Sequence, residues 1–144
     1  MSIKQLFAKK WAKRVVNSTN KWAQNPIATQ EKVLKMLLQK AKKTAFGQDH
    51  GFAQIENYED FAKQVPIRDY EGLRPYVDRV VAGEADILWP GKPRYFSKTS
   101  GTTSGVKYIP ISKESMPTHI KTAQNALFHY IHHSGNTSFV DGKM

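Results

Sequence analysis

Apolar residues recur at helical spacing through most of the first 93 residues, and this repeat limits the fold more than any other feature of the sequence. The first such stretch predicts one amphipathic helix over residues 2–23, with lysines placed between its apolar positions. These positions are Ile3, Leu6, Phe7, Trp11, Val15 and Trp22. Because two tryptophans form a large apolar surface, we expect this stripe to be buried against another part of the protein.

Further helices follow the first. Asn25 is pushed out of the helical region by Pro26 and so ends the first helix. Either Thr29 or Asn25 then caps a second helix, for which Phe46-Gly47 is the predicted stop. A short helix over residues 57–64 and an extended segment over 65–67 come next. Asp69 is the predicted cap of a helix that reaches Val81, with a break near Pro75. Residues 1–93 are therefore expected to be mainly helical.

Strand candidates occur only later in the chain. Residues 94–97 and 108–111 are predicted strands on either side of a loop, so residues 94–111 form a strand–loop–strand motif. Ser112 is expected to cap a helix over residues 112–135, which Gly135 ends. Residues 136–144 are expected to form a turn and the start of a truncated strand at 138–140. So few strands do not make a stable sheet unaided, and we expect an α/β fold of which the chain is an incomplete N-terminal portion.

Charge is concentrated near the N-terminus. The chain has a net charge of +10, and residues 1–50 hold eleven Lys and Arg against only Glu31 and Asp49. A solvated helix face, a nucleic-acid surface and an anionic membrane surface all agree with this pattern. The chain has no cysteine, no secretory signal and no apolar run long enough to span a membrane, which favours a cytoplasmic protein.

The loop between the strand candidates is rich in hydroxyl groups and glycine. It comprises Thr99, Ser100, Gly101, Thr102, Thr103, Ser104, Gly105, Val106 and Lys107. Glycines let backbone N–H groups approach a phosphate, hydroxyls add donors and the lysine adds positive charge. A polar turn is the alternative, because Ser, Thr and Gly are common in turns.

Several other kinds of site find little support in the sequence. The loop matches neither the Gly-x-x-x-x-Gly-Lys-Ser/Thr motif nor the Gly-x-Gly-x-x-Gly motif. Ser100 lacks the Gly-x-Ser-x-Gly elbow of a hydrolase. His129, His132 and His133 have helical spacing that suits a metal, but no Asp or Glu accompanies them, so no metal site is predicted.

The segment from Phe96 to Lys107 resembles the first nucleotide-binding signature of adenylate-forming enzymes. Its flanks are similar to the GH3 acyl acid–amido synthetases of that superfamily. The similar segments are Thr44 to Gly47, Phe61 to Glu71, Pro75-Tyr76, Gly83-Glu84 and Lys107 to Pro110. The resemblance implies that the chain is the N-terminal portion of one large ATP-binding domain.

The resemblance also implies a reaction and its participants. A carboxylic acid would be adenylated by ATP, with Mg²⁺ accompanying the nucleotide, and an amine such as an amino acid would then displace AMP. Phosphate contacts would come from eight residues of the loop, namely Thr99, Ser100, Gly101, Thr102, Thr103, Ser104, Gly105 and Lys107. Lys107 is either a charge partner or a residue that holds the shape of the loop. No catalytic residue is identified, and the 144 residues alone are expected to be inactive.

Two alternatives of other kinds remain. The basic N-terminal helices suit an interaction module that binds nucleic acid or an acidic partner, although the synthetase interpretation itself expects no nucleic-acid partner. Another adenylate-forming ligase, one that makes an acyl-CoA thioester, would carry the same loop.

Overall fold

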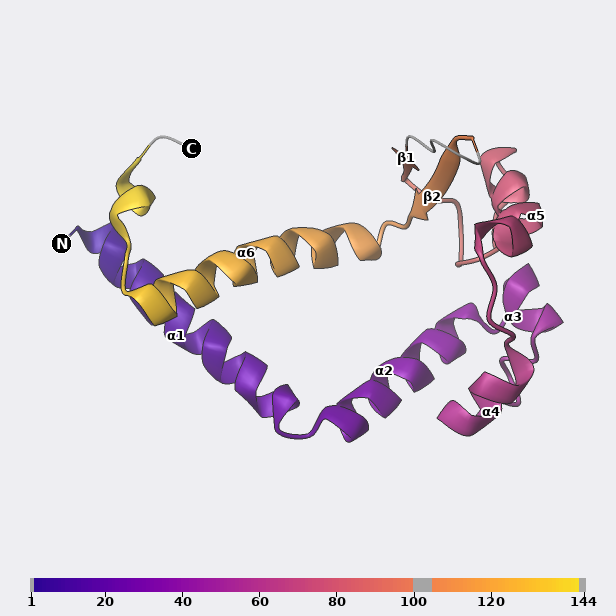
Figure 1. The fold of residues 1–144 in the computed structure, drawn as a ribbon, viewed down its shortest axis with the longest axis horizontal. Coiled ribbons are helices and arrows are strands. Elements are labelled where there is room, and N and C mark those ends of the chain that lie inside the picture. Colours follow the sequence, from indigo (N-terminus) through magenta and orange to yellow (C-terminus); the bar gives the residue numbers. More distant parts are fainter. Residues whose placement is uncertain (1, 100–104, 143–144) are drawn as a thin grey trace. The chain divides into compact units, whose positions relative to one another are not determined.

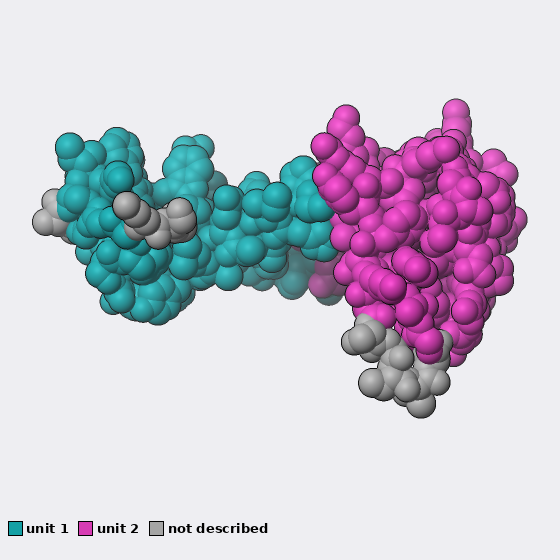
Figure 2. All heavy atoms as spheres, turned by 90° about the horizontal axis from the view of Figure 1, so that it is seen from above, with its two compact units in different colours: residues 1–27, 116–144 teal, residues 28–115 magenta. Residues whose placement is uncertain are grey.

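The structure, a computed structural model, describes residues 2–99 and 105–142. The chain divides into two compact units, which Figure 2 distinguishes by colour. Unit 1 comprises residues 1–27 and 116–144, and unit 2 comprises residues 28–115. Figure 1 traces the elements of both units, which are mostly helices together with one small sheet.

Unit 1 contains α1 (Ile3–Ala23), nearly all of α6 (Ser115–Ser134) and a short 3-10 helix, η1 (Ser138–Asp141). Ser2 caps α1 by accepting a hydrogen bond from the backbone N–H of Gln5 at 3.2 Å. The Oγ1 atom of Thr19 lies 3.0 Å from Nε2 of His129, which joins α1 to α6. The side chains that this unit buries most completely are Ala12, Val16, Ile131 and Thr137.

Most of the apolar stripe predicted on α1 is not buried. Ile3, Leu6, Phe7, Trp11 and Trp22 are exposed and Val15 is half-buried, whereas the structure buries Ala12 and Val16. The small side chain at Ala12, which is 0% exposed, lets neighbouring elements approach the helix closely. The expected burial of the stripe is therefore wrong for the part of the chain that is described.

The strand predicted at residues 138–140 is also wrong. These residues lie in η1, where the backbone N–H of Val140 donates to the carbonyl of Thr137 at 3.1 Å. The Oδ1 atom of Asn136 accepts from the backbone N–H of Ser138 at 3.0 Å, which starts this turn locally. Local bonds of this kind satisfy the backbone without a partner strand.

Unit 2 contains most of α2 (Pro26–Ala41) and all of α3 (Ala45–Asp49), α4 (Tyr58–Gln64) and α5 (Tyr70–Val81). Helix α2 begins at Pro26, where a missing N–H costs nothing, so Asn25 and not Thr29 stands at its boundary. The apolar core consists of Leu38, Ala41, Ile55, Val77, Val80 and Ile87.

Phe46 and Gly47 do not stop the second helix, contrary to the prediction. Helix α2 ends at Ala41, and Thr44 caps the separate helix α3. The buried Oγ1 of Thr44 accepts from the N–H of Gly47 at 3.0 Å and donates to the carbonyl of Ala41 at 2.7 Å. One hydroxyl therefore joins the end of one helix to the start of the next.

Helix α3 is also tied to a distant segment and to an aromatic cluster. The N–H groups of Ala45 and Phe46 donate to the carbonyls of Asp86 and Ile87 at 2.8 and 3.0 Å. The ring of Phe46 stacks on His50 with centroids 4.0 Å apart. These bonds satisfy N–H groups that a helix start would otherwise leave without partners.

Side chains cap both α4 and α5, and the cap predicted at Asp69 is confirmed. Asn57 accepts from the N–H of Asp60 at 2.9 Å, and Asp69 accepts from the N–H of Gly72 at 2.8 Å. The break predicted near Pro75 is wrong, because α5 runs without interruption through it. A proline at this position removes a single backbone bond, and the rest of the helix retains its own.

The sheet has two antiparallel strands, β1 (Tyr95–Thr99) and β2 (Lys107–Ile111). The register places Tyr95 opposite Ile111 and Thr99 opposite Lys107. Both predicted strands are confirmed, and each comes closer to the loop than expected. Helix α6 then begins near Ser112, whose Oγ accepts from the N–H of Ser115 at 3.0 Å.

None of the helices within the described residues has both the length and the apolar character needed to cross a membrane.

Gly47→Ala should destabilise unit 2. A Cβ at this position would lie 2.1 Å from the carbonyl oxygen of Ala41, which is backbone and cannot rotate away. We expect the free energy of unfolding to fall by about 2 kcal/mol or more. The midpoint of urea denaturation measures this loss.

Gly72→Ala is the matched control, because it also adds one methyl group to a helical glycine. Its new Cβ would meet only side-chain atoms of Arg68, at 3.2 Å or more. A change within about 1 kcal/mol is expected, since alanine also favours the helix. Equal effects of the two substitutions would contradict the close approach at Gly47.

Candidate functional site

The hairpin of β1 and β2 presents the hydroxyl-rich loop at the end of its ladder. Thr99 is the last residue of β1 and lies opposite Lys107, the first residue of β2. Of the eight predicted phosphate-binding residues, the structure describes these two and Gly105. The other five, Ser100, Gly101, Thr102, Thr103 and Ser104, lie outside the described residues.

Gly105 leads the loop back into β2 with a positive φ of 78°. A side chain added there would find no atom within 4 Å, so space is not the reason for a glycine. The reason is the backbone conformation, which costs a residue with a Cβ about 1 kcal/mol or more. This part of the loop therefore depends on glycine for its path.

Lys107 contacts the first residue of α5. Its Nζ atom lies 5.4 Å from the centroid of the Tyr70 ring, in the geometry of a cation–π interaction. The sequence allowed Lys107 to be a charge partner or to hold the loop in shape. The contact with Tyr70 agrees with a role in holding the shape of the loop. A direct contact between Lys107 and phosphate stays a prediction.

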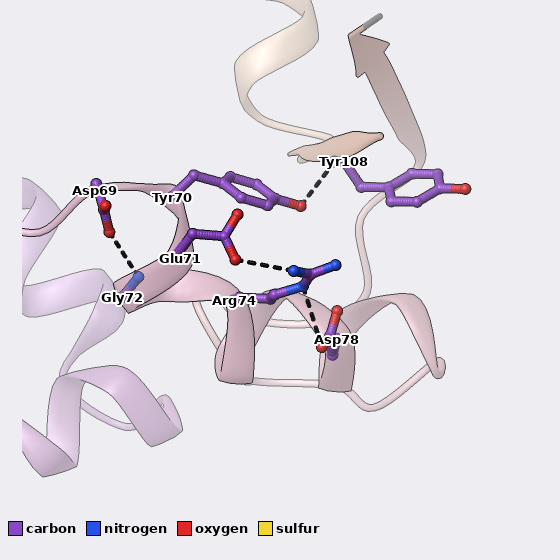
Figure 3. A network of polar contacts seen from close by, with 7 residues as sticks. All are labelled: Asp69, Tyr70, Glu71, Gly72, Arg74, Asp78 and Tyr108. Carbon is purple, nitrogen blue, oxygen red and sulfur yellow. Dashed lines mark hydrogen bonds and ion pairs between the residues drawn. The ribbon is translucent and has the colours of Figure 1, made fainter. Parts of the chain in front are cut away.

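Tyr70 also binds the backbone of β2. The N–H of Tyr108 donates to the Tyr70 hydroxyl at 2.9 Å, as Figure 3 shows. This N–H is thus used outside the ladder, and Pro110, two residues further along, has no N–H to offer. The edge of β2 that faces away from β1 is therefore closed by a tyrosine and a proline.

The start of α5 is held by polar contacts around Tyr70 (Figure 3). Asp69 caps the helix, and Arg74 lies 2.9 Å from a carboxylate oxygen of Glu71 and 4.0 Å from one of Asp78. The hydrogen bond and the charge of Glu71 raise the pKa of Arg74 above its usual range. These contacts are exposed, so they orient the first turn more than they stabilise the fold.

Sequence reasoning missed Tyr70 and Tyr108 as parts of the site. Tyr70 belongs to the Phe61-to-Glu71 segment that carried part of the resemblance. Because it lies far from the loop along the chain, the sequence predicts no function for it. The signal was its position directly after the cap Asp69, at the first turn of a helix. Nothing in the sequence fixes which strand that turn would contact.

The apolar hollow beside β2 is separate from the loop. It has a volume of about 120 Å³, and Trp89, Pro110 and Ser112 are among its lining residues. Trp89 also donates from Nε1 to a carboxylate oxygen of Glu114 at 3.1 Å. Thr99, Gly105 and Lys107 do not line this hollow.

The histidines of α6 lie close together near its end. The rings of His129 and His133 are stacked with centroids 6.2 Å apart, and His132 lies 5.3 Å from His133. His129 is engaged with Thr19 of α1. Within residues 2–99 and 105–142, no group of three or more His, Asp and Glu side chains could hold a metal ion.

Comparison with known proteins identifies relatives over much of the chain. Residues 15–143 match the GH3 family N-terminal domain. The chain is 33% identical over 89 residues to the indole-3-acetic acid-amido synthetase GH3.15 of Arabidopsis thaliana, which covers 60% of the chain and 15% of that protein. It is 34% identical over 89 residues to the jasmonoyl–L-amino acid synthetase JAR6 of Nicotiana attenuata, with the same two coverages.

A solved structure agrees with these matches. The structure of the GH3.15 acyl acid amido synthetase aligns with a TM-score of 0.62 and 28% identity, over 69% of this chain and 18% of that one. The chain thus spans about 15% of the length of the curated relatives named here. Since the domain match runs from residue 15 to residue 143, the chain belongs to the GH3 family and corresponds to its N-terminal domain.

Proposed function

We propose that these residues are the N-terminal part of an ATP-dependent acyl acid–amido synthetase within a larger α/β ATP-binding domain. The relatives are named as an indole-3-acetic acid-amido synthetase and a jasmonoyl–L-amino acid synthetase. The observation that carries the proposal for this chain is the hairpin, whose ladder ends on either side of the loop at Thr99 and Lys107.

The first step would be adenylation. An oxygen of the substrate carboxylate attacks the α-phosphorus of ATP, the bond from that phosphorus to the bridging oxygen breaks, and pyrophosphate leaves. Mg²⁺ would enter with ATP as part of this substrate. Negative charge grows on the phosphate oxygens during the step, so donors fixed around them stabilise the transition state more than the ground state.

The loop would supply those donors. Ser100, Thr102, Thr103 and Ser104 carry hydroxyls, and Gly101 and Gly105 let the backbone approach. Lys107 adds positive charge where the loop ends, while its contact with Tyr70 holds it at the base of the hairpin. A strand pair is a suitable frame, because its ladder fixes both ends of the loop.

The second step would form the amide. The nitrogen of an amino acid attacks the acyl carbonyl carbon, the bond from that carbon to the AMP oxygen breaks, and the nitrogen loses a proton. An acyl-CoA ligase would use a thiol at this step instead. Product analysis with an amino acid and with coenzyme A as alternative acceptors separates these outcomes.

Thr102→Ala should suppress adenylation in the full-length protein. Loss of one donor to the developing charge is expected to lower the rate of ATP–pyrophosphate exchange on the order of 100-fold. The assay uses a panel of small carboxylic acids, and exchange should require a particular acid. Thr118→Ala is the control, because this exposed threonine lies on α6 and outside the loop. No exchange from well-folded wild-type protein across the panel would contradict the proposed function.

Gly105→Ala and Gly91→Ala form a second matched pair. The two glycines have φ values of 78° and 76°, and neither has an atom within 4 Å of an added Cβ. Both substitutions should therefore destabilise the protein by about 1 kcal/mol. Only Gly105→Ala should also raise the KM for ATP, which steady-state exchange kinetics measures. An equal rise for Gly91→Ala would place the effect outside the loop.

Tyr70→Phe should weaken ATP binding with little change in fold. The substitution keeps the ring beneath Lys107 and removes the acceptor of the Tyr108 N–H. A bond worth about 1 kcal/mol corresponds to about a fivefold rise in the dissociation constant of ATP. Titration calorimetry measures this constant.

Tyr76→Phe is the control for that change, because it lies on the same helix and loses a 2.7 Å bond to Asp49. Its hydroxyl has a raised pKa, caused first by burial and then by the bond to Asp49, so it stays protonated and donates that bond. Its removal should lower stability by about 1 kcal/mol and leave ATP affinity unchanged. If both variants weakened ATP binding to the same degree, the result would contradict the proposed role of the Tyr70 hydroxyl in positioning β2 for ATP binding.

A further inference from the structure

Helix α1 carries only positively charged side chains and no acidic ones. Residues 3–23 contain no Asp or Glu, and the first acidic residue of the chain is Glu31. The basic residues of α1 are Lys4, Lys9, Lys10, Lys13, Arg14 and Lys21. The N-terminal half of this helix, residues 3–14, also lies outside the stretch that matches the GH3 domain, which begins at residue 15.

The helix has an exposed apolar stripe that continues from its packed side, where Trp11 lines a hollow shared with Met116 and Ile120 of α6. Ala12 and Val16 are buried in unit 1, at 0% and 5% exposure. The exposed stripe consists of Ile3, Leu6, Phe7 and Trp11, with exposures of 76%, 59%, 67% and 54%. Positions 3, 7 and 11 follow one another at intervals of four, so they share one side of the helix. The stripe is thus available while unit 1 stays folded.

Charge and apolar side chains are interleaved on this stripe. The guanidinium carbon of Arg14 lies 5.7 Å from the ring of Trp11, and Lys10, three residues after Phe7 and four after Leu6, neighbours both on the helix. Lysine and arginine stems can lie along apolar surface while their charged ends reach polar groups. Tryptophan, likewise, suits a boundary between apolar and polar surroundings.

The partner must offer negative charge and an apolar interior together. A nucleic acid offers the charge but gives no place to Ile3 and Leu6. A second copy of the chain would bring six like charges of α1 against this one. A bilayer with anionic headgroups offers both features, and a basic helix with aromatic and aliphatic residues on one side is the kind that lies in its interface.

We propose that α1 binds the anionic surface of a lipid bilayer, with Ile3, Leu6, Phe7 and Trp11 inserted at the level of the headgroups. The helix would lie in the plane of the surface, since no helix of the described residues can cross a membrane. Each Lys or Arg near the anionic surface would contribute roughly a fivefold gain in affinity. This inference does not depend on the proposed synthetase activity.

The test is cosedimentation of the full chain with vesicles of phosphatidylcholine and phosphatidylserine in about a 2:1 ratio, beside vesicles of phosphatidylcholine alone. Binding is expected only to the anionic vesicles. It should weaken strongly between about 0.05 M and about 0.5 M salt, because the screening length shortens. Binding to duplex DNA in the same buffers without binding to vesicles would overturn the proposal.

Paired variants locate the surface. Leu6→Ser with Phe7→Ser should lower vesicle affinity about tenfold or more, whereas Ile67→Ser should not, although Ile67 is the most exposed apolar residue of unit 2. Lys10→Gln with Lys13→Gln should lower it roughly 25-fold, and Lys32→Gln with Lys35→Gln on α2 should leave it unchanged. The four substituted positions on α1, Leu6, Phe7, Lys10 and Lys13, are all exposed, and circular dichroism checks that each variant is folded. Unchanged vesicle binding by both α1 variants would overturn the assignment.

Discussion

The hydrogen bond from the Tyr108 N–H to the Tyr70 hydroxyl is the contact on which the geometry of the candidate site depends. A two-stranded sheet is marginal by itself, and all five residues of β1 are exposed. The sheet is therefore attached to the rest of unit 2 through β2, whose Tyr108 is bound to Tyr70 at the start of α5. Lys107, over the same ring, adds a second point of attachment. The loop that would hold phosphate thus begins and ends on a frame set by one tyrosine.

The segments that carry the resemblance to GH3 enzymes have physical roles in unit 2. Thr44 caps α3 with a buried hydroxyl, and Gly47 lets that helix pass close to the carbonyl of Ala41. Glu84, just beyond α5, accepts a hydrogen bond from Arg79 at 3.0 Å. These residues build the scaffold, whereas the chemistry would lie in the loop. A scaffold of this kind is compatible with many substrates, because it holds the two ends of the loop and specifies no substrate by itself.

In unit 1 the main question is which side of α1 is packed against its neighbours. Helix α1 packs through the small residue Ala12 and joins α6 through Thr19 and His129. Its large apolar residues and its lysines remain on the other side, where they suit an external anionic surface. A tryptophan at helical spacing is thus no guarantee of burial in the core. The neighbouring elements decide which side is covered, and here they cover the side with the smallest side chain.

The sequence by itself determined the helical first part, the short helix over residues 57–64, the cap at Asp69, the two strands and the GH3 family, because these depend on local spacing and on short motifs. It misplaced the end of the second helix at Phe46-Gly47, the break at Pro75 and the strand at residues 138–140. In the first and third cases short-range side-chain bonds from Thr44 and Asn136 set the local structure, and at Pro75 the remaining bonds of α5 continue the helix. Only the tertiary structure decided that Tyr70 supports β2, and which side of α1 is buried. Both depend on contacts between residues far apart in the chain, separated by 38 positions for Tyr70 and Tyr108, and no local pattern encodes such a contact.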